Sequence, residues 1–260
     1  MLTVRSADGT PIAYERSGSG EPVILVGGAL CVRASTGPLG EALAPNFTVV
    51  SYDRRGRGDS GDNDSYAVAR EVEDLGALIT ALGGTAAVYG HSSGAALVVA
   101  AAASGLPIGK VVLHEPPYGE DDEESKRESD EAGATVIRLL AENRRVEAVE
   151  AFLTMAGIPA EDAAGMAGAP GMAEVAHTLA YDFAVMDNGA PGGVVPLEPL
   201  GKVTQPGLVI CGSVSPPFMT EAARKVAKVL PGGRLVELDG HHHVVPPEVL
   251  APVLVEFLKA

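Results

Sequence analysis

The pentapeptide Gly90-His91-Ser92-Ser93-Gly94 constrains this chain more than any other feature. An apolar run, Ala86-Ala87-Val88-Tyr89, precedes it, and a run of small and apolar residues from Ala95 to Ala100 follows it. This order predicts a strand, a tight turn and a helix, which is the context that a nucleophile elbow requires. The glycines allow close backbone packing and a strained serine, and the helix N-terminus favours negative charge near the Ser92 hydroxyl.

Composition narrows the protein class. A chain of 260 residues suits one α/β domain with an insertion, and 46% hydrophobic residues exclude a disordered chain. The formal net charge of −15 disfavours nucleic acid and anionic membranes as partners, because both are negatively charged. The two cysteines, Cys31 and Cys211, have neither disulfide nor metal-ligand spacing, which favours a reducing compartment.

The sequence also bears on localisation. Met1 to Gly18 has no apolar segment of the signal-peptide type, and the longest apolar run, Ala95 to Ala103, is too short to span a bilayer. We therefore expect a cytoplasmic protein without a membrane partner. The oligomeric state stays open.

Eight apolar runs predict the strands of one large sheet: 2–5, 12–15, 23–26, 47–52, 86–89, 110–114, 208–211 and 234–238. The first two runs, joined by Ala7-Asp8-Gly9-Thr10, predict an antiparallel hairpin. From Val23 onward, helical patterns such as Ala67 to Leu82 and Thr220 to Leu230 separate most runs. Several runs are apolar on both faces, as central parallel strands must be. The predicted fold class is α/β, with a mostly parallel eight-stranded sheet flanked by helices.

The strand pattern stops between Pro116 and Gln205. Helical stretches at 132–143 and 146–156 replace it. We therefore predict a core of residues 1–116 and 205–260 and a helical cap insertion of residues 117–204. The charge run from Glu120 to Glu131 at the start of the insertion predicts a solvated loop and a helix start.

Four local patterns, taken in order, resemble the α/β-hydrolase superfamily, particularly its small bacterial esterase-like and cofactor-free haloperoxidase-like members. Beside the pentapeptide, Val23 to Ala29 is similar to the third strand and oxyanion loop of that superfamily. Ser51 to Ser60 is similar to its D-x-R-G-x-G-x-S turn, and Leu238 to His243 to the loop of its catalytic histidine. The resemblance covers both core segments and implies the α/β-hydrolase fold.

The chemistry of this site needs a base beside the serine. A serine hydroxyl is a poor nucleophile unless a neutral imidazole accepts its proton, so we expect Ser92 to attack and one histidine of the triplet at 241–243 to act as base. The resemblance favours His243, because the family's base follows the glycine after the last strand by two or three residues. His242 is the alternative. A zinc site is a weaker interpretation, because consecutive side chains diverge.

The resemblance also implies the binding groups. The backbone amides of Ala29 and Ser93 match the family's oxyanion donors. Gly27-Gly28 stand where the family usually has a His-Gly pair, but both donors belong to the main chain, so the hole does not depend on that histidine. The predicted substrate-binding residues line an apolar acyl pocket or border the nucleophile: Gly28, His91, Phe183, Met186 and Phe218.

The acid departs from the family pattern. The family places an aspartate after the seventh strand, where this chain has Ser215. A variation within the superfamily places the acid after the sixth strand, where this chain has Glu115. Glu115 is therefore the predicted acid, because its task is to fix the imidazole tautomer, which depends on reach and not on chain order. Asp239 and Asp187 remain alternatives.

Together these residues predict a serine hydrolase that cleaves a carboxylic ester, a lactone or a thioester through an acyl-enzyme on Ser92. The expected partner is a small-molecule substrate with an apolar acyl part, and neither a metal nor a cofactor is expected. Two alternatives stay open. One is a non-hydrolytic ligand-binding protein on the same fold, and the other is a perhydrolase- or lyase-like activity of the same site.

Overall fold

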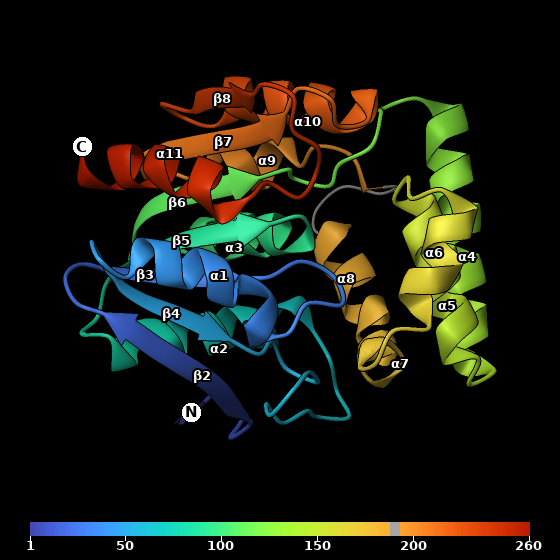
Figure 1. Ribbon diagram of the computed structural model, residues 1–260, viewed down its shortest axis with the longest axis horizontal. Coiled ribbons are helices and arrows are strands. Elements are labelled where there is room, and N and C mark those ends of the chain that lie inside the picture. The colour runs from blue at the N-terminus through green and yellow to red at the C-terminus, as the bar shows by residue number, and fades with distance from the viewer. Residues whose placement is uncertain (188–192) are drawn as a thin grey trace.

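The apolar runs of the sequence form one eight-stranded sheet in the computed structural model, which describes residues 1–187 and 193–260 (Figure 1). The strands are β1 (Leu2–Arg5), β2 (Pro11–Gly18), β3 (Pro22–Val26), β4 (Thr48–Tyr52), β5 (Ala86–His91), β6 (Ile108–His114), β7 (Gly207–Gly212) and β8 (Arg234–Leu238). Their order across the sheet is β1-β2-β4-β3-β5-β6-β7-β8. Strand β2 runs antiparallel to β1 and β4, and all other neighbours are parallel. The predicted fold class and N-terminal hairpin are confirmed.

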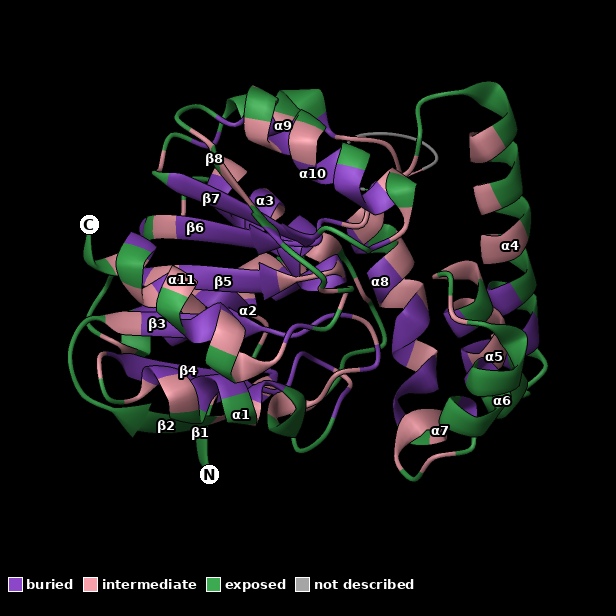
Figure 2. Ribbon diagram, turned by 45° about the horizontal axis from the view of Figure 1, so that its top comes forward, coloured by how far each residue is buried: buried purple, intermediate pink, exposed green. Residues whose placement is uncertain are grey.

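Helices cover both faces of the sheet, so its central strands are buried from both sides (Figure 2). Helices α1 (Arg33–Leu43) and α11 (Pro247–Lys259) pack on one face through leucines that include Leu43 and Leu254. Helices α2 (Val68–Ala81), α3 (Ser93–Ala103), α9 (Leu197–Gly201) and α10 (Pro217–Val229) cover the other face. Strand β7 is buried at every residue, which explains why its sequence is apolar on both faces.

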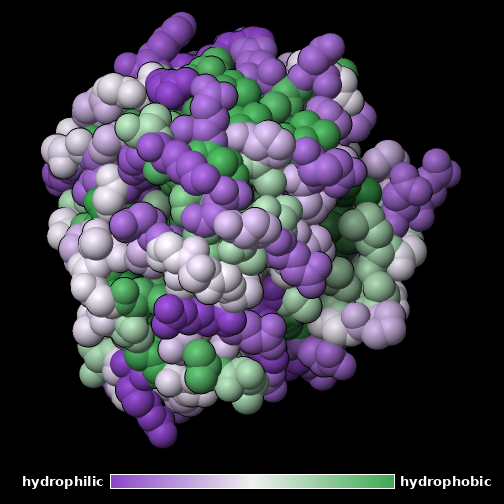
Figure 3. Space-filling view, turned by 60° about the vertical axis from the view of Figure 1, so that its left-hand side comes forward, coloured by the Kyte–Doolittle hydropathy of each residue, from purple (hydrophilic) through white to green (hydrophobic). Residues whose placement is uncertain are grey.

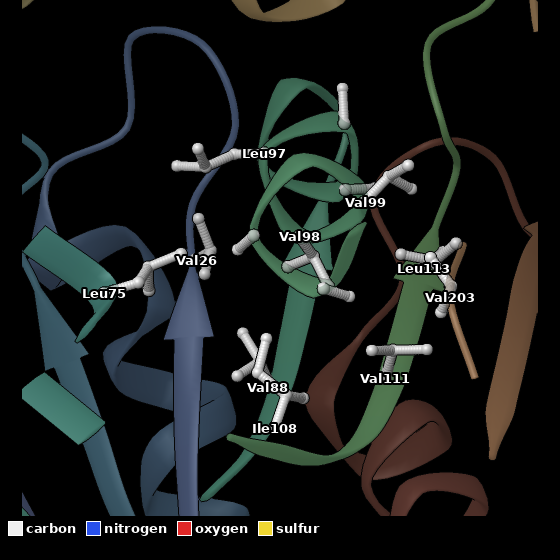
Figure 4. Packing of buried hydrophobic residues seen from close by; sticks show 14 of the residues in the cluster. Val26, Leu75, Val88, Leu97, Val98, Val99, Ile108, Val111, Leu113 and Val203 are labelled. Carbon is white, nitrogen blue, oxygen red and sulfur yellow. The ribbon is translucent and has the colours of Figure 1, made fainter. Parts of the chain in front are cut away.

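Helix α3 is enclosed by its neighbours. Nine of its eleven residues are buried, and its sequence consists almost entirely of small and branched apolar residues. Figure 4 shows its apolar side chains beside those of β3, β5 and β6: Leu97, Val98 and Val99 of the helix, with Val26, Val88, Val111 and Leu113 of the strands. A helix that is apolar all round requires cover on every side. This packing holds the start of α3, and with it Ser92, in a fixed place.

Between β6 and β7 the chain forms helices that lie beyond the carboxyl ends of the parallel strands (Figure 1). We call α4 (Glu123–Ala141), α5 (Arg145–Met155), α6 (Ala160–Ala167), α7 (Met172–Val175), the short 3₁₀ helix η1 (Ala176–Thr178) and α8 (Leu179–Met186) the helical insertion. It has an apolar cluster of its own, which includes Val136, Val149 and Leu179 and receives Leu30 from the loop after β3. Helix α8 packs on α3, and α9 packs on α3 and α10.

The charge run at the start of the insertion becomes helical earlier than the predicted stretch at 132–143. Helix α4 begins at Glu123, because the Asp122 side chain caps its N-terminus and accepts hydrogen bonds from the amides of Glu124 and Ser125 at 3.1 and 3.0 Å. Acidic residues in the first turn also suit the positive end of the helix dipole.

No helix in the described ranges is long and apolar enough to cross a membrane. Hydrophilic and hydrophobic residues are intermingled over the face shown in Figure 3.

Candidate active site

Ser92 lies at the sharp turn between β5 and α3, with a φ of 55° and a ψ of −126°. A non-glycine residue adopts a positive φ only at an energetic cost, so the surrounding packing must impose it. The turn leaves no room for side chains beside it: a Cβ atom on Gly94 would collide with the Val26 carbonyl oxygen, and one on Gly90 would collide with the backbone of Gly94. The Ser92 amide donates to the His114 carbonyl oxygen at 2.9 Å. The structure thus explains both glycines of the pentapeptide.

The structure brings Glu115 and His243 together. The Nδ1 atom of His243 lies 3.0 Å from Oε2 of Glu115, whose side chain is fully buried. The other carboxylate oxygen, Oε1, accepts hydrogen bonds from the Gly212 amide and from the Ser215 hydroxyl, each at 2.7 Å. Ser215, which stands at the family's usual acid position, therefore binds Glu115, the acid expected after the neighbouring strand.

These contacts determine the charge of Glu115. Burial opposes its ionisation, but hydrogen bonds from His243, the Gly212 amide and Ser215 outweigh burial and hold the pKa of Glu115 below its ordinary value. An ionised carboxylate can only accept, so the Nδ1 atom of His243 carries the proton that is shared with Glu115. The Nε2 atom of His243 is then free to accept a proton.

The Ser92 hydroxyl makes no hydrogen bond to any residue that the structure describes. His243 nevertheless lies close to the elbow, because its ring packs at a tilt against that of His91, the residue before Ser92, with centroids 4.5 Å apart. Hydrogen bonds between nucleophile and base are often long before a substrate binds. The site therefore holds the three groups in one place with the serine hydroxyl unengaged.

His91 packs behind the site and does not line the cavity described below. Its ring lies between those of His243 and His114, and its Nε2 atom is 3.0 Å from the His243 carbonyl oxygen. His114 in turn meets the Tyr89 hydroxyl at 2.6 Å through Nδ1. Burial, and the repulsion that a protonated His243 would exert, lower the pKa of His91 to about 4. His91 is therefore neutral at pH 7 and supports the loop that carries His243.

The loop after β3 passes directly beside Ser92. A Cβ atom on Gly28 would lie 3.0 Å from the Cβ atom of Ser92 and 3.6 Å from its hydroxyl oxygen, so only glycine leaves the hydroxyl its present space. The next residue is Ala29, and Ser93 follows Ser92 at the start of α3. The two expected oxyanion donors thus follow Gly28 and Ser92, two residues of separate segments that lie against each other.

A cavity of about 500 Å³ reaches Ser92, a size that suits a small organic ligand. The predicted residues Phe183, Met186 and Phe218 line it, together with three further apolar side chains, Phe152, Met155 and Met219. Its remaining side chains are mostly polar or acidic: Glu120, Ser125, Glu128, Ser129 and Asp187. The sequence analysis missed the first four of these, because it treated the charge run at 120–131 as a solvated segment.

The turn after β4 is held by internal hydrogen bonds. The Ser60 hydroxyl donates to the Asp53 carbonyl oxygen at 2.6 Å, and Arg55 binds Asp74 through two bonds of 2.8 and 2.7 Å. Two other arginines of this turn, Arg54 and Arg57, are also buried, and sequence reasoning assigned them no role. A signal for their burial was available in the sequence: three arginines stand within four residues, shortly after a run that predicts a buried strand, in a chain that is acidic overall.

The comparisons with known proteins agree with this arrangement. The sequence model of the Alpha/beta hydrolase family matches residues 23–253. The chain belongs to this family. An alpha/beta hydrolase from Sphaerobacter thermophilus DSM 20745 is 49% identical, with a TM-score of 0.87 over 99% of this chain and 100% of that one.

Two curated proteins share parts of the sequence. The 2-(acetamidomethylene)succinate hydrolase of Mesorhizobium japonicum is 30% identical over 94% of this chain and 90% of its own length. The N-formylmaleamate deformylase of Pseudomonas putida is 36% identical over 43% of this chain and 44% of its own length. Family membership and the names of these relatives support an enzyme of the hydrolase class.

The histidine triplet does not form a metal site in the structure. Within residues 1–187 and 193–260, no three His, Cys, Asp or Glu side chains are grouped so that they could hold a metal ion. His242 is exposed, whereas His243 turns to Glu115.

Proposed function

We propose that this protein is a serine hydrolase that cleaves carboxylic esters through an acyl-enzyme on Ser92. The contact between Glu115 and His243, beside a serine held at a positive φ, is the observation that carries the proposal. This contact orients His243 as a base for Ser92, whose hydroxyl the sharp turn presents to the cavity. The ligand-binding alternative had two grounds, the missing aspartate after the seventh strand and Gly27 in place of the oxyanion-loop histidine. The buried Glu115 carboxylate at the imidazole answers the first. The second is answered if both oxyanion donors are main-chain amides.

The reaction follows from these positions. The Ser92 oxygen attacks the carbonyl carbon while the Nε2 atom of His243 takes its proton, and His243 then gives that proton to the departing alcohol. A water molecule attacks the acyl-enzyme next, losing a proton to His243, which returns it to Ser92 as the acid leaves. Glu115 stays ionised and stabilises the imidazolium in both halves of the reaction. The amides of Ala29 and Ser93 stabilise the oxyanion, aided by the N-terminal dipole of α3.

The cavity supports an uncharged substrate with an apolar acyl part. Phe152, Phe183 and Met186 provide apolar contact area, and no lysine or arginine occurs among the described residues that line the cavity. The sequence of the undescribed segment 188–192 contains no basic residue either. Succinate and maleamate, in the names of the curated relatives, carry carboxylates, which would enter this cavity without a cationic partner and next to Glu120 and Glu128.

Burst kinetics and covalent labelling test the proposed function. With p-nitrophenyl butyrate, we expect a rapid release of one p-nitrophenol per protein before steady turnover, because an activated ester acylates Ser92 faster than the acyl-enzyme is hydrolysed. A fluorophosphonate should label Ser92, and Ser92→Ala should lose both the burst and the label while keeping the wild-type Tm. A wild-type protein that releases no p-nitrophenol and resists labelling would instead support a ligand-binding protein.

A further inference from the structure

Arg57 is a buried arginine whose side chain reaches the loop beside the nucleophile. Its side chain is 1% exposed, and all three of its nitrogens have partners. Nη1 donates to the carbonyl oxygens of Gly28 at 2.7 Å and Cys31 at 3.3 Å, Nε donates to the Thr178 hydroxyl at 3.0 Å, and Nη2 donates to Asp182 at 2.7 Å. Such a fixed fork holds its acceptors in a defined geometry.

The bond to the Gly28 carbonyl has a geometric consequence for Ala29. The carbonyl oxygen of Gly28 and the amide hydrogen of Ala29 belong to one planar trans peptide, so they point in opposite directions. A guanidinium that fixes the oxygen therefore fixes the direction of the amide. It also polarises the peptide, which makes the Ala29 amide a stronger donor. Because Gly28 lies against Ser92, this amide borders the position where the oxyanion forms.

Asp182 of α8 connects both sides of the oxyanion site. Its Oδ2 atom binds Arg57, and its Oδ1 atom accepts from the Ser93 hydroxyl at 2.7 Å and from Arg54 at 2.8 Å. Arg54 also binds Glu71 through two bonds of 2.6 and 2.7 Å. The buried cluster thus contains two cations and two anions. Asp182, which belongs to the helical insertion, thus binds the side chain of Ser93, whose amide is one expected oxyanion donor. Through Arg57 it also holds the Gly28 peptide, which carries the other expected donor, the Ala29 amide.

Leu30 adds an independent link between the same loop and the helical insertion. It has a positive φ of 61°, and its side chain is buried in the apolar cluster of the insertion. A branched residue takes this backbone conformation only where its surroundings impose it. Residues 28 and 30 of the loop are therefore both held by contacts that involve the helical insertion.

We propose that Arg57, anchored by Asp182, is a positioning residue that aims the Ala29 amide at the oxyanion and couples the oxyanion hole to the helical insertion. The proposal rests on the proposed function, since it requires an oxyanion at Ser92. Arg57 does not touch the substrate; it acts through the Gly28 peptide.

The variant Arg57→Lys tests this role. A lysine keeps the charge beside Asp182 but cannot hold the carbonyl, the hydroxyl and the carboxylate at once. We expect kcat to fall about 10- to 100-fold with KM changed less than about twofold, because the lost contact stabilises only the transition state. The Ki of an alkyl trifluoromethyl ketone, whose adduct with Ser92 places an oxyanion in the hole, should rise by the same factor as kcat/KM falls.

Arg55→Lys is the matched control. Arg55 is equally buried on the same turn and pairs with Asp74 and Asp8, but it does not contact the loop beside Ser92. It should lower the Tm by a similar amount while kcat and the ketone Ki stay within about twofold of wild type. A loss of kcat in both variants, or wild-type kcat and Ki in Arg57→Lys, would overturn the positioning role.

A milder variant covers the case in which Arg57→Lys does not fold. Thr178→Val removes one acceptor of Arg57 at nearly constant volume and should lower kcat and weaken the ketone together, with KM unchanged. If it changes only the Tm, the positioning role is wrong. A wild-type protein that neither hydrolyses esters nor binds the ketone would refute the proposed function, and the positioning role with it. An active wild type with an unaffected Arg57→Lys variant refutes the positioning role alone.

Discussion

Glu115 Oε2 lies 3.0 Å from His243 Nδ1, although 128 residues separate the two in the chain. Glu115 directly follows β6 and His243 follows β8, while Gly212 and Ser215, at the end of β7 between them, both donate to the carboxylate. Because these strands are parallel neighbours, their carboxyl ends share one edge. An acid at the end of either β6 or β7 can therefore orient the same imidazole. The geometry of a triad thus does not depend on the order of its residues in the chain.

Glu115→Gln should impair catalysis without weakening substrate binding. The amide keeps the size of the carboxylate but can present an N–H to Nδ1, which favours the wrong imidazole tautomer. We expect kcat to fall about 10²- to 10⁴-fold with KM nearly unchanged, measured with p-nitrophenyl butyrate. Asp239→Asn is the control, because Asp239 accepts a bond from Ser213 at 3.3 Å rather than from the imidazole. Equal activity of the Glu115 variant and wild type would show that another group orients His243.

His243→Ala and His242→Ala should differ sharply, although the two residues are adjacent. Only His243 contacts Glu115, and the side chain of His242 is exposed. We expect His243→Ala to lower the acylation rate by about 10³-fold or more and His242→Ala to retain most of the burst. Stopped-flow measurement of the burst phase separates the two. The reverse order would mean that the base is one residue earlier than the structure indicates.

Stability should decline in mild acid because of the buried histidines. Burial lowers the pKa of His91 to about 4 and that of His114 well below its ordinary value, whereas in the unfolded chain both protonate near pH 6.5. Below pH 6.5 the unfolded state thus binds more protons than the folded state, so the free energy of unfolding falls as the pH drops from about 6.5 towards 4. Urea unfolding at pH 7 and pH 5 should show a smaller decrease for His91→Asn than for wild type. Parallel decreases would contradict the lowered pKa of His91.

A carboxylate on the acyl chain should slow hydrolysis. Methyl 4-methylpentanoate and monomethyl succinate have acyl chains with the same number and connectivity of heavy atoms, with an isopropyl group in one and a carboxylate in the other. We expect kcat/KM to be at least about tenfold lower for the anion, because the described residues that line the cavity include no lysine or arginine.

A cation introduced at one lining residue tests whether the missing positive charge is the cause of the slower hydrolysis. Ser129→Arg should reduce the difference between the two esters, and Ser129→Gln, which adds length without charge, should not. An anionic ester that wild type hydrolyses as fast as its neutral counterpart would overturn the proposed substrate class.

Most of the fold was predictable because each strand leaves a local signal. The apolar runs match the eight strands, with ends that differ by a few residues, and the pentapeptide matches the turn from β5 to α3. The first residues of the helices were harder to predict from the sequence. Helix α4 extends to Glu123 because of a cap at Asp122, whereas hydrophobic periodicity begins to show only near Ala132.

The residues of the candidate site that come after strand ends were predictable from the sequence, and the others were less so. Ser92, Glu115 and His243 each come directly after a strand or its following turn, so their meeting at one edge could be inferred. Asp182 could not be inferred, because a single aspartate within a short apolar helix gives no sign that it faces Arg54 and Arg57 more than a hundred residues away. Only the packing of α8 on α3 makes that residue part of the site.

The buried contacts of Asp182 also limit how freely the helical insertion could be exchanged between relatives. Its own apolar cluster suggests a separable module. Its removal would nevertheless leave the buried Arg54 with Glu71 as its remaining carboxylate partner, and the buried Arg57 with none among the described residues. A chimeric protein that takes its insertion from another hydrolase would therefore need a carboxylate at the position of Asp182 and a pocket for Leu30. The helical insertion can therefore be exchanged only for one that supplies the negative charge that the buried arginines of the core require.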